Sequence, residues 1–202
     1  FPSEAGSLSV NTGLQVLGGY GFCTDFKLQQ YYRDIRISAL YEGTTGIQSQ
    51  DLLGRKVSLQ NGKALELLAS EIMHTVHLAS NHSDLKPYAD QLENKLQLSQ
   101  KILQKLIPFA MKGNYERYLS DANLFMEFMS VVVLSWLWLE MAVNSKETLA
   151  SGILKYEEDF YESKIHTMKF YYKYELPKTI SLAESLMSDE VLTIKQDKEY
   201  II

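Results

Sequence analysis

One carboxylate lies in a turn whose residue types suit proton transfer. Residues 40–48 read Leu-Tyr-Glu-Gly-Thr-Thr-Gly-Ile-Gln, so Glu42 precedes a glycine and stands just before an apolar helical pattern. A carboxylate can act as a general base, but an acidic residue near a helix N-terminus also stabilises the helix dipole without any chemistry. Glu42 taken alone therefore has two interpretations, a catalytic one and a structural one.

A glycine cluster, Gly18-Gly19-Tyr20-Gly21, is the second candidate. A dinucleotide-binding glycine loop follows a β-strand inside a βαβ unit, and the sequence shows no such pattern here. Glycines directly after an apolar helical pattern are typical of a helix end. Local sequence therefore favours helix termination at this cluster.

Histidine and cysteine offer little further chemistry. His74 and His77 lie three residues apart with Glu71 on the same helical side, but no additional ligand pattern completes a metal site. We predict no bound metal. Cys23 follows no nucleophile motif and has no neighbouring histidine in the sequence, which is typical of an ordinary thiol.

Helical periodicity accounts for most of the chain. It predicts helices over residues 3–17, 26–35, 44–57, 65–82, 88–112, 120–144, 154–175 and 179–186. Ser83 or Asp84 is expected to cap the helix that contains Pro87 in its first turns. Because the predicted loops are short, neighbouring helices should run antiparallel, which gives an all-α helical bundle fold.

The character of the sequence changes near residues 58–62. We expect a glycine-rich, motif-bearing domain over 1–57, a bundle domain of long regular helices over 58–188, and a tail over 189–202 whose structure the sequence leaves open. The uncharged run Phe128–Leu139 is shorter than the roughly 20 residues that span a bilayer, so it predicts a buried helix and no membrane span.

Composition excludes some functions. The formal net charge of −5 argues against a nucleic-acid surface, which needs a basic stripe. A single cysteine excludes an intrachain disulfide framework, and no secretory signal is visible, so we expect a reducing, cytoplasmic location. Because the chain does not begin with Met, we expect an excised or truncated piece of a longer protein.

Three blocks of sequence, taken together, resemble the C-terminal helical domain of acyl-CoA dehydrogenases. They are residues 15–21 (Gln-Val-Leu-Gly-Gly-Tyr-Gly), 32–37 (Tyr-Arg-Asp-Ile-Arg-Ile) and 41–48, in matching order and spacing. Residues 51–56 (Asp-Leu-Leu-Gly-Arg-Lys) further resemble the branch with an extra helical C-terminal domain, which includes methylthiopropanoyl-CoA dehydrogenase. The resemblance implies an all-α fold like that domain.

The resemblance implies a role for the turn around Glu42. Glu42 occupies the position of the base that removes the α-proton of an acyl-CoA thioester, while a hydride leaves the β-carbon for FAD. A carboxylate shielded from water gains basicity through desolvation, which suits this role. Gly43 would bind the substrate, because it allows close approach of the thioester to the backbone N–H.

The resemblance also implies cofactor contacts and partners. FAD would contact Thr44 and Gly46, although Gly46 stands where medium-chain members carry a glutamine. The adenosine diphosphate part of FAD, typically bound to a neighbouring subunit, would lie against Gln15, Leu17, Gly18 and Gly19. Expected partners are the acyl-CoA substrate, electron-transfer flavoprotein or a similar acceptor, and further copies of the chain in a dimer or tetramer.

Two other functions stay open. The chain could be a non-catalytic helical module for oligomerisation, or it could belong to an acyl-CoA oxidase, which has a related Tyr-Glu-Gly turn. The family also needs an N-terminal helical domain and a β domain to hold the flavin and the acyl chain, and residues 1–202 contain neither pattern. We therefore expect a C-terminal fragment that is inactive by itself and does not retain FAD.

Overall fold

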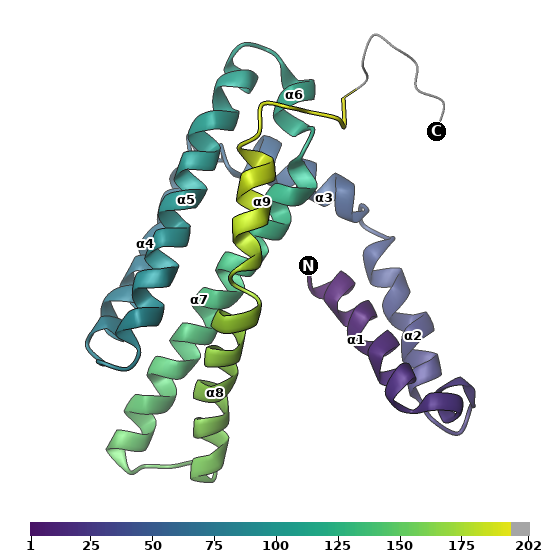
Figure 1. Ribbon diagram of the computed structural model, residues 1–202, viewed down its shortest axis with the longest axis vertical. Helices are drawn as coiled ribbons and strands as arrows, with labels where there is room; N and C mark the ends of the chain where they lie inside the picture. Colours follow the sequence, from purple (N-terminus) through teal and green to yellow (C-terminus); the bar gives the residue numbers. More distant parts are fainter. Residues whose placement is uncertain (195–202) are drawn as a thin grey trace. The chain divides into compact units, whose positions relative to one another are not determined.

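The computed structural model describes residues 1–194, which form helices and contain no strand (Figure 1). The all-α fold class is therefore confirmed. The chain divides into two compact units, Phe1–Asp51 and Leu52–Ile202, called unit 1 and unit 2 here. Our domain boundaries at 57/58 and 188/189 stay a prediction, and residues 195–202 of the predicted tail lie outside the described part.

Unit 1 is a helical hairpin followed by a short helix. Its elements are α1 (Pro2–Val16), the 3₁₀ turn η1 (Gly18–Phe22), α2 (Leu28–Arg36), the 3₁₀ turn η2 (Ile37–Ala39) and α3 (Thr45–Asp51). α1 and α2 pack antiparallel, since Gly6 lies against Ile35 and Gly13 against Leu28, where an added Cβ would come within 3.2 and 3.3 Å of those side chains. The two glycines that weaken the helical pattern of α1 thus let α2 approach closely.

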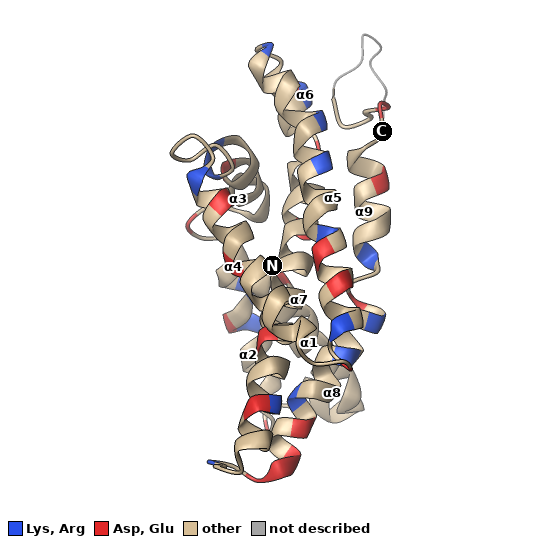
Figure 2. Cartoon of the chain, turned by 90° about the vertical axis from the view of Figure 1, so that its left-hand side faces the viewer, with Lys and Arg blue, Asp and Glu red and all other residues tan. Residues whose placement is uncertain are grey.

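Unit 2 is a bundle of longer helices. It contains the π-helical turn η3 (Leu52–Lys56), α4 (Lys63–Ser80), α5 (Lys86–Met111), α6 (Tyr115–Leu119), α7 (Ala122–Ser151), α8 (Glu158–Tyr174) and α9 (Lys178–Leu186). α7 packs against α4, α5, α8 and α9, and the latter two follow one another along it (Figure 1). Figure 2 shows acidic and basic residues interspersed along these helices.

The core of unit 2 lies around α7. Its side chains Phe125, Phe128, Val132 and Leu139 have no exposed surface. α7 is also the one helix in residues 1–194 that is long and apolar enough to cross a membrane. Burial by four neighbouring helices is the ordinary reason for such a composition in a core helix, so the composition of α7 is weak evidence for a membrane span.

Several local expectations were wrong. The helix after the 81–85 turn has Leu85 as its N-cap residue, and no side chain forms a capping hydrogen bond there. Neither Ser83 nor Asp84 therefore caps it. Asp84 instead forms an ion pair with Lys146 of α7, and the hydrogen bond from this ammonium group holds the pKa of Asp84 below its usual value. The Asp84 carboxylate thus connects the turn before α5 to α7 and does not cap α5.

Helix boundaries also differ from the periodic pattern. The predicted helix over 44–57 is α-helical only to Asp51 and becomes the π turn η3, α6 was not predicted, and α7 continues to Ser151 rather than residue 144. The predicted start at residue 154 is too early, because α8 begins at Glu158. Pro87 does occupy the first turn of α5, as predicted.

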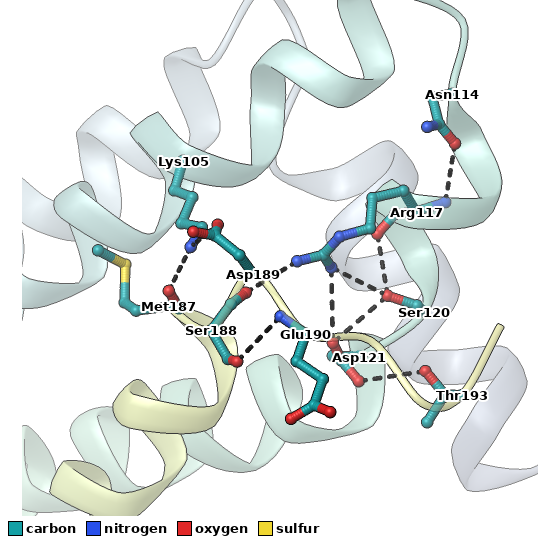
Figure 3. Close-up of polar contacts among 10 residues, drawn as sticks. All are labelled: Lys105, Asn114, Arg117, Ser120, Asp121, Met187, Ser188, Asp189, Glu190 and Thr193. Carbon is teal, nitrogen blue, oxygen red and sulfur yellow. Dashed lines mark hydrogen bonds and ion pairs between the residues drawn. The ribbon is translucent and has the colours of Figure 1, made fainter.

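The segment after α9 crosses the end of the bundle and is held there by charged side chains (Figure 3). We call residues 187–193 the C-terminal strap. Lys105 of α5 donates to the carbonyl oxygen of Met187 and pairs with Asp189 at 2.7 Å. Arg117 donates to the carbonyl oxygen of Ser188 at 3.0 Å.

Arg117 connects the strap to the bundle interior. Its guanidinium lies 3.6 Å from the Asp121 carboxylate, donates to the Ser120 hydroxyl at 3.2 Å, and stacks 5.0 Å from the centre of the Phe109 ring. The residue is only 8% exposed, so its charge is buried but paired. Thr193 of the strap donates to the same Asp121 at 3.4 Å.

Candidate functional site

The turn between η2 and α3 has an unusual backbone. Glu42 has φ 57° and Gly43 has φ 93°, so two successive residues adopt the left-handed region. For a residue with a side chain this conformation costs roughly 1–2 kcal/mol, so the surroundings must hold it. The Glu42 side chain is exposed. Its carboxylate makes no hydrogen bond or ion pair with any residue of 1–194.

Side chains on both sides hold this turn. The Gln48 side-chain amide donates to the backbone carbonyl oxygen of Glu42 at 2.6 Å. The Thr45 hydroxyl donates to the Glu4 carboxylate at 2.5 Å, which fixes the start of α3 to the first turn of α1. An added Cβ at Gly43 would lie 3.2 Å from Gln48 Nε2, so glycine fits this tight position.

The other residues predicted around Glu42 lie in the same turn. Thr44 is exposed and its carbonyl oxygen accepts the first helical hydrogen bond of α3 at 3.0 Å. Gly46 is half-buried in the first turn of α3, and the buried Ser49 donates to its carbonyl oxygen at 2.7 Å. The structure thus groups Glu42, Gly43, Thr44 and Gly46 within one turn.

The predicted adenosine diphosphate segment lies at the other end of α1. Leu17 follows the last residue of α1, and Gly18 (φ 58°) begins the 3₁₀ turn, so the cluster does terminate the helix as local sequence indicates. Gly21 is buried against the Leu14 carbonyl oxygen, only 2.3 Å from an added Cβ. At Gly18 and Gly19 an added Cβ would meet nothing within 4 Å, so their backbone faces open space.

A pocket of about 610 Å³ opens beside this turn. Its lining combines amide side chains, glycine backbone, one leucine and two aromatic rings. The lining residues are Asn11, Leu14, Gln15, Gly18, Gly21, Phe22, Gln29 and Tyr32. Amide side chains and exposed backbone can hydrogen-bond a phosphate or ribose, while the rings offer apolar surface. The pocket includes Gln15 and Gly18 of the four residues predicted to contact the adenosine diphosphate part of FAD.

The two groups of predicted residues are separated along α1. The 15 residues of α1 span roughly 22 Å at the usual helical rise of about 1.5 Å per residue. The Glu42 turn is fixed to the start of this helix through Glu4, and the pocket lies at its end. The Glu42 turn and the pocket are thus two separate places in unit 1, and Glu42 does not line the pocket.

Sequence reasoning missed several residues of these sites. Gln48 and Glu4 hold the Glu42 turn, and Asn11, Phe22 and Gln29 line the pocket. Gln48 could have been found from the sequence, since it lies within the 41–48 block. Glu4 could not, because it lies 41 residues before its partner Thr45 and belongs to no motif. In the described part of the chain, no group of three His, Cys, Asp or Glu residues could hold a metal ion, and this includes the His74 and His77 region.

Comparisons with known proteins cover nearly the whole chain. Residues 1–56 match the family model described as acyl-CoA dehydrogenase, C-terminal domain, and residues 68–195 match the model described as acetyl-CoA dehydrogenase C-terminal like. The first match contains both the Glu42 turn and the Gly18 turn. The second contains the unit 2 helices from α5 to α9 and most of α4.

Individual relatives agree with these matches. A broad-specificity linear acyl-CoA dehydrogenase from Mycobacterium tuberculosis is 31% identical over 188 residues, which are 90% of this chain and 31% of the relative. A 3-methylmercaptopropionyl-CoA dehydrogenase from Ruegeria pomeroyi is 43% identical over 75 residues, 37% of this chain and 13% of the relative. A butyryl-CoA dehydrogenase from Syntrophomonas wolfei is 25% identical over 190 residues, 94% of this chain and 31% of the relative. This chain spans at most about a third of their length.

Proposed function

Because this chain belongs to the acyl-CoA dehydrogenase family and corresponds to its C-terminal helical part, we propose that it supplies the catalytic base of a flavin-dependent acyl-CoA dehydrogenase. The second family match, over residues 68–195, supports the expected appended helical domain. The proposed reaction is α,β-dehydrogenation of an acyl-CoA thioester, with Glu42 removing the α-proton.

The free carboxylate of Glu42 in a strained, braced turn carries this proposal. Glu42 has φ 57° and an exposed side chain, although its backbone carbonyl is bonded to Gln48. A left-handed non-glycine residue persists where its surroundings impose the conformation, and such residues cluster at functional sites. The structural alternative, in which the Glu42 charge stabilises the helix dipole of α3, requires no hydrogen bond, and the Glu42→Gln variant described below separates the two roles.

The residues of the turn have different roles in the proposed reaction. Glu42 accepts the α-proton on its carboxylate, and the backbone N–H of Gly43 binds the thioester carbonyl oxygen, which stabilises the negative charge that develops there. FAD, when bound, accepts the hydride that leaves the β-carbon. Thr44 and Gly46 would hold the cofactor beside Glu42.

The pocket at η1 supports a second cofactor contact. Gln15, Leu17, Gly18 and Gly19 would bind the adenosine diphosphate part of FAD through backbone and amide groups. The roughly 22 Å between this pocket and the Glu42 turn is consistent with two chains contributing to each FAD, so we propose a homo-oligomer. An electron-transfer flavoprotein or similar acceptor would reoxidise the cofactor, in the cytoplasm.

Unit 1 by itself does not have the core of a stable catalytic domain. Large apolar side chains lie exposed on it, including Val16 at 80%, Phe22 at 92% and Ile47 at 58%. Apolar surface of this extent indicates that further protein covers it. We therefore propose that the 202-residue chain alone neither retains FAD nor oxidises acyl-CoA, and that both require the rest of the protein.

The test uses the intact enzyme and its variant Glu42→Gln. The variant should keep its bound flavin but reduce it with acyl-CoA at least about a hundredfold more slowly, because the base is lost while the shape is kept. Unchanged flavin reduction would remove Glu42 from the mechanism. If the wild type also lacks turnover, an oligomerisation module is the better description, and stoichiometric peroxide release would identify an oxidase instead.

A further inference from the structure

The side chain of Gln48 forms a close polar contact with the carbonyl oxygen of Glu42. Gln48 Nε2 donates to this oxygen at 2.6 Å across six residues of chain. Glu42 and Gly43 have left-handed backbone conformations, so the Glu42 carbonyl oxygen is not part of a regular helix. The Gln48 amide supplies the hydrogen-bond donor that this oxygen would otherwise find in the backbone. The bond therefore fixes the backbone from which the Glu42 carboxylate projects.

Packing around Gly43 restricts the same turn. An added Cβ on Gly43 would lie 3.2 Å from Gln48 Nε2 and 3.2 Å from Ile47 Cγ2. Residues 47 and 48 thus cover one face of Gly43, and the Gln48 amide is close to both residues of the turn. A change in the Gln48 side chain should move Glu42 and Gly43 together.

The helix that carries Gln48 is itself held in place. Thr45 donates to Glu4 of α1 at 2.5 Å, and Ser49, which is 1% exposed, donates to the Gly46 carbonyl oxygen at 2.7 Å. A side chain on a fixed helix can position a neighbouring group within a fraction of an ångström, which catalysis requires. Gln48 is therefore carried by a short helix that the Thr45–Glu4 hydrogen bond ties to α1, although its own side chain is exposed.

We propose that Gln48 is a positioning residue for proton abstraction, acting through its hydrogen bond to the Glu42 carbonyl oxygen. This inference rests on the proposed role of Glu42 as the base. Gln48 itself takes no proton and needs no contact with substrate. Without its amide donor, Glu42 samples other backbone conformations, and its carboxylate spends less time at the α-carbon.

The experiment compares Gln48→Met with Gln50→Met in the intact flavoenzyme. Methionine keeps the length of glutamine but removes the donor. Gln50 is also exposed, lies on the same helix and provides the matched control. With butyryl-CoA, octanoyl-CoA and palmitoyl-CoA as probes, Gln48→Met should lower kcat by about tenfold to a hundredfold, because a misplacement of about 1 Å is costly. Gln50→Met should stay within about twofold of the wild type.

Further readouts separate positioning from a general loss of structure. Gln48→Met should keep its flavin content, thermal midpoint and KM, and an α-deuterated substrate should show a larger isotope effect on kcat, because proton removal becomes more rate-limiting. Unchanged kcat would overturn the inference. So would a loss of kcat accompanied by an equal loss of flavin, since that outcome shows only a structural role.

The double variant distinguishes failure of this inference from failure of the proposed function. If Gln48 acts through Glu42, Glu42→Gln combined with Gln48→Met should be no slower than Glu42→Gln alone. Additive losses would show that Gln48 acts elsewhere. Full activity of Glu42→Gln would refute the base itself, whereas an inactive Glu42→Gln beside a fully active Gln48→Met refutes only the positioning role.

Discussion

The hydroxyl of Tyr118 donates a buried hydrogen bond of 2.6 Å to the backbone carbonyl oxygen of Leu53. Leu53 lies in the π turn η3 and has no exposed surface, while Tyr118 on α6 is 5% exposed. The widened spacing of a π turn changes the partners of its backbone groups. α6, the short helix that periodicity missed, thus supplies the partner that this turn needs.

Tyr118→Phe should lower the unfolding free energy of the 202-residue chain by about 1–3 kcal/mol, because the Leu53 carbonyl oxygen would be left buried without a donor. Urea unfolding, followed by the fluorescence of Trp136 and Trp138 on α7, would measure the loss in unit 2. Tyr115→Phe is the matched control, since Tyr115 is 62% exposed on the same helix. Equal stability of the two variants would contradict the role of this bond.

The C-terminal strap should be released by a change at Lys105. Lys105→Met removes both the donor to Met187 and the ion pair with Asp189. A protease that cuts after glutamate should then cleave at Glu190 several-fold faster, because local opening governs such cleavage. Lys101→Met, one turn earlier on α5 at an exposed position, should leave the rate unchanged. Equal rates in both variants would show that the strap is held by other contacts.

Unit 2 should lose stability above about pH 10. Burial raises the pKa of Tyr118, raises that of Tyr172, and, with the nearby Glu175 charge, raises that of Tyr171 to about 12. Above the ordinary tyrosine pKa of about 10, the unfolded chain releases these protons while the folded chain retains them, so the free energy of unfolding falls as pH rises. Below that range their contribution is fully present.

Urea unfolding in steps from about pH 9 to about pH 11.5 would measure this slope. Lys95 opposes this decline in the lower part of the pH range. Burial lowers the pKa of Lys95, so the contribution of Lys95 to the free energy of unfolding rises with pH up to about pH 10.4. Tyr172→Phe should flatten the decline. A free energy of unfolding that stays constant to about pH 11.5 would contradict the buried state of these tyrosines.

Apolar periodicity was sufficient to predict most helices because packing, rather than capping, determines them. Ile72, Val76 and Ala79 on α4 are all buried as their spacing indicates. The same pattern continues through Leu52 and Leu53, so sequence could not distinguish an α turn from the π turn η3. A distant donor, Tyr118, bonds to the carbonyl oxygen of Leu53 in this turn, and no local pattern reveals that contact.

Sequence motifs could propose the residues of the candidate site but not the side chains that hold them. Glu42, Gly43 and the glycines at 18 and 19 belong to contiguous motifs, so the resemblance could identify them together. Glu4 is polar and exposed like many first-turn residues, and only the fold brings it to Thr45. Asp84 failed as a predicted cap for the same reason, because its partner Lys146 lies 62 residues away.

Because α1 separates the Glu42 turn from the Gly18 turn, variants with defects at its two ends should complement each other. If the proposed base and the proposed adenosine diphosphate site at its two ends serve different flavins, an allele with Glu42→Gln and an allele with Gly19→Glu carry defects in separable halves of a shared site. Gly19→Glu would add negative charge where nothing lies within 4 Å, so it should repel a diphosphate without a steric clash. Co-expressed, the two inactive alleles should restore part of the activity through mixed oligomers, whereas a strain with both changes on one allele should stay inactive.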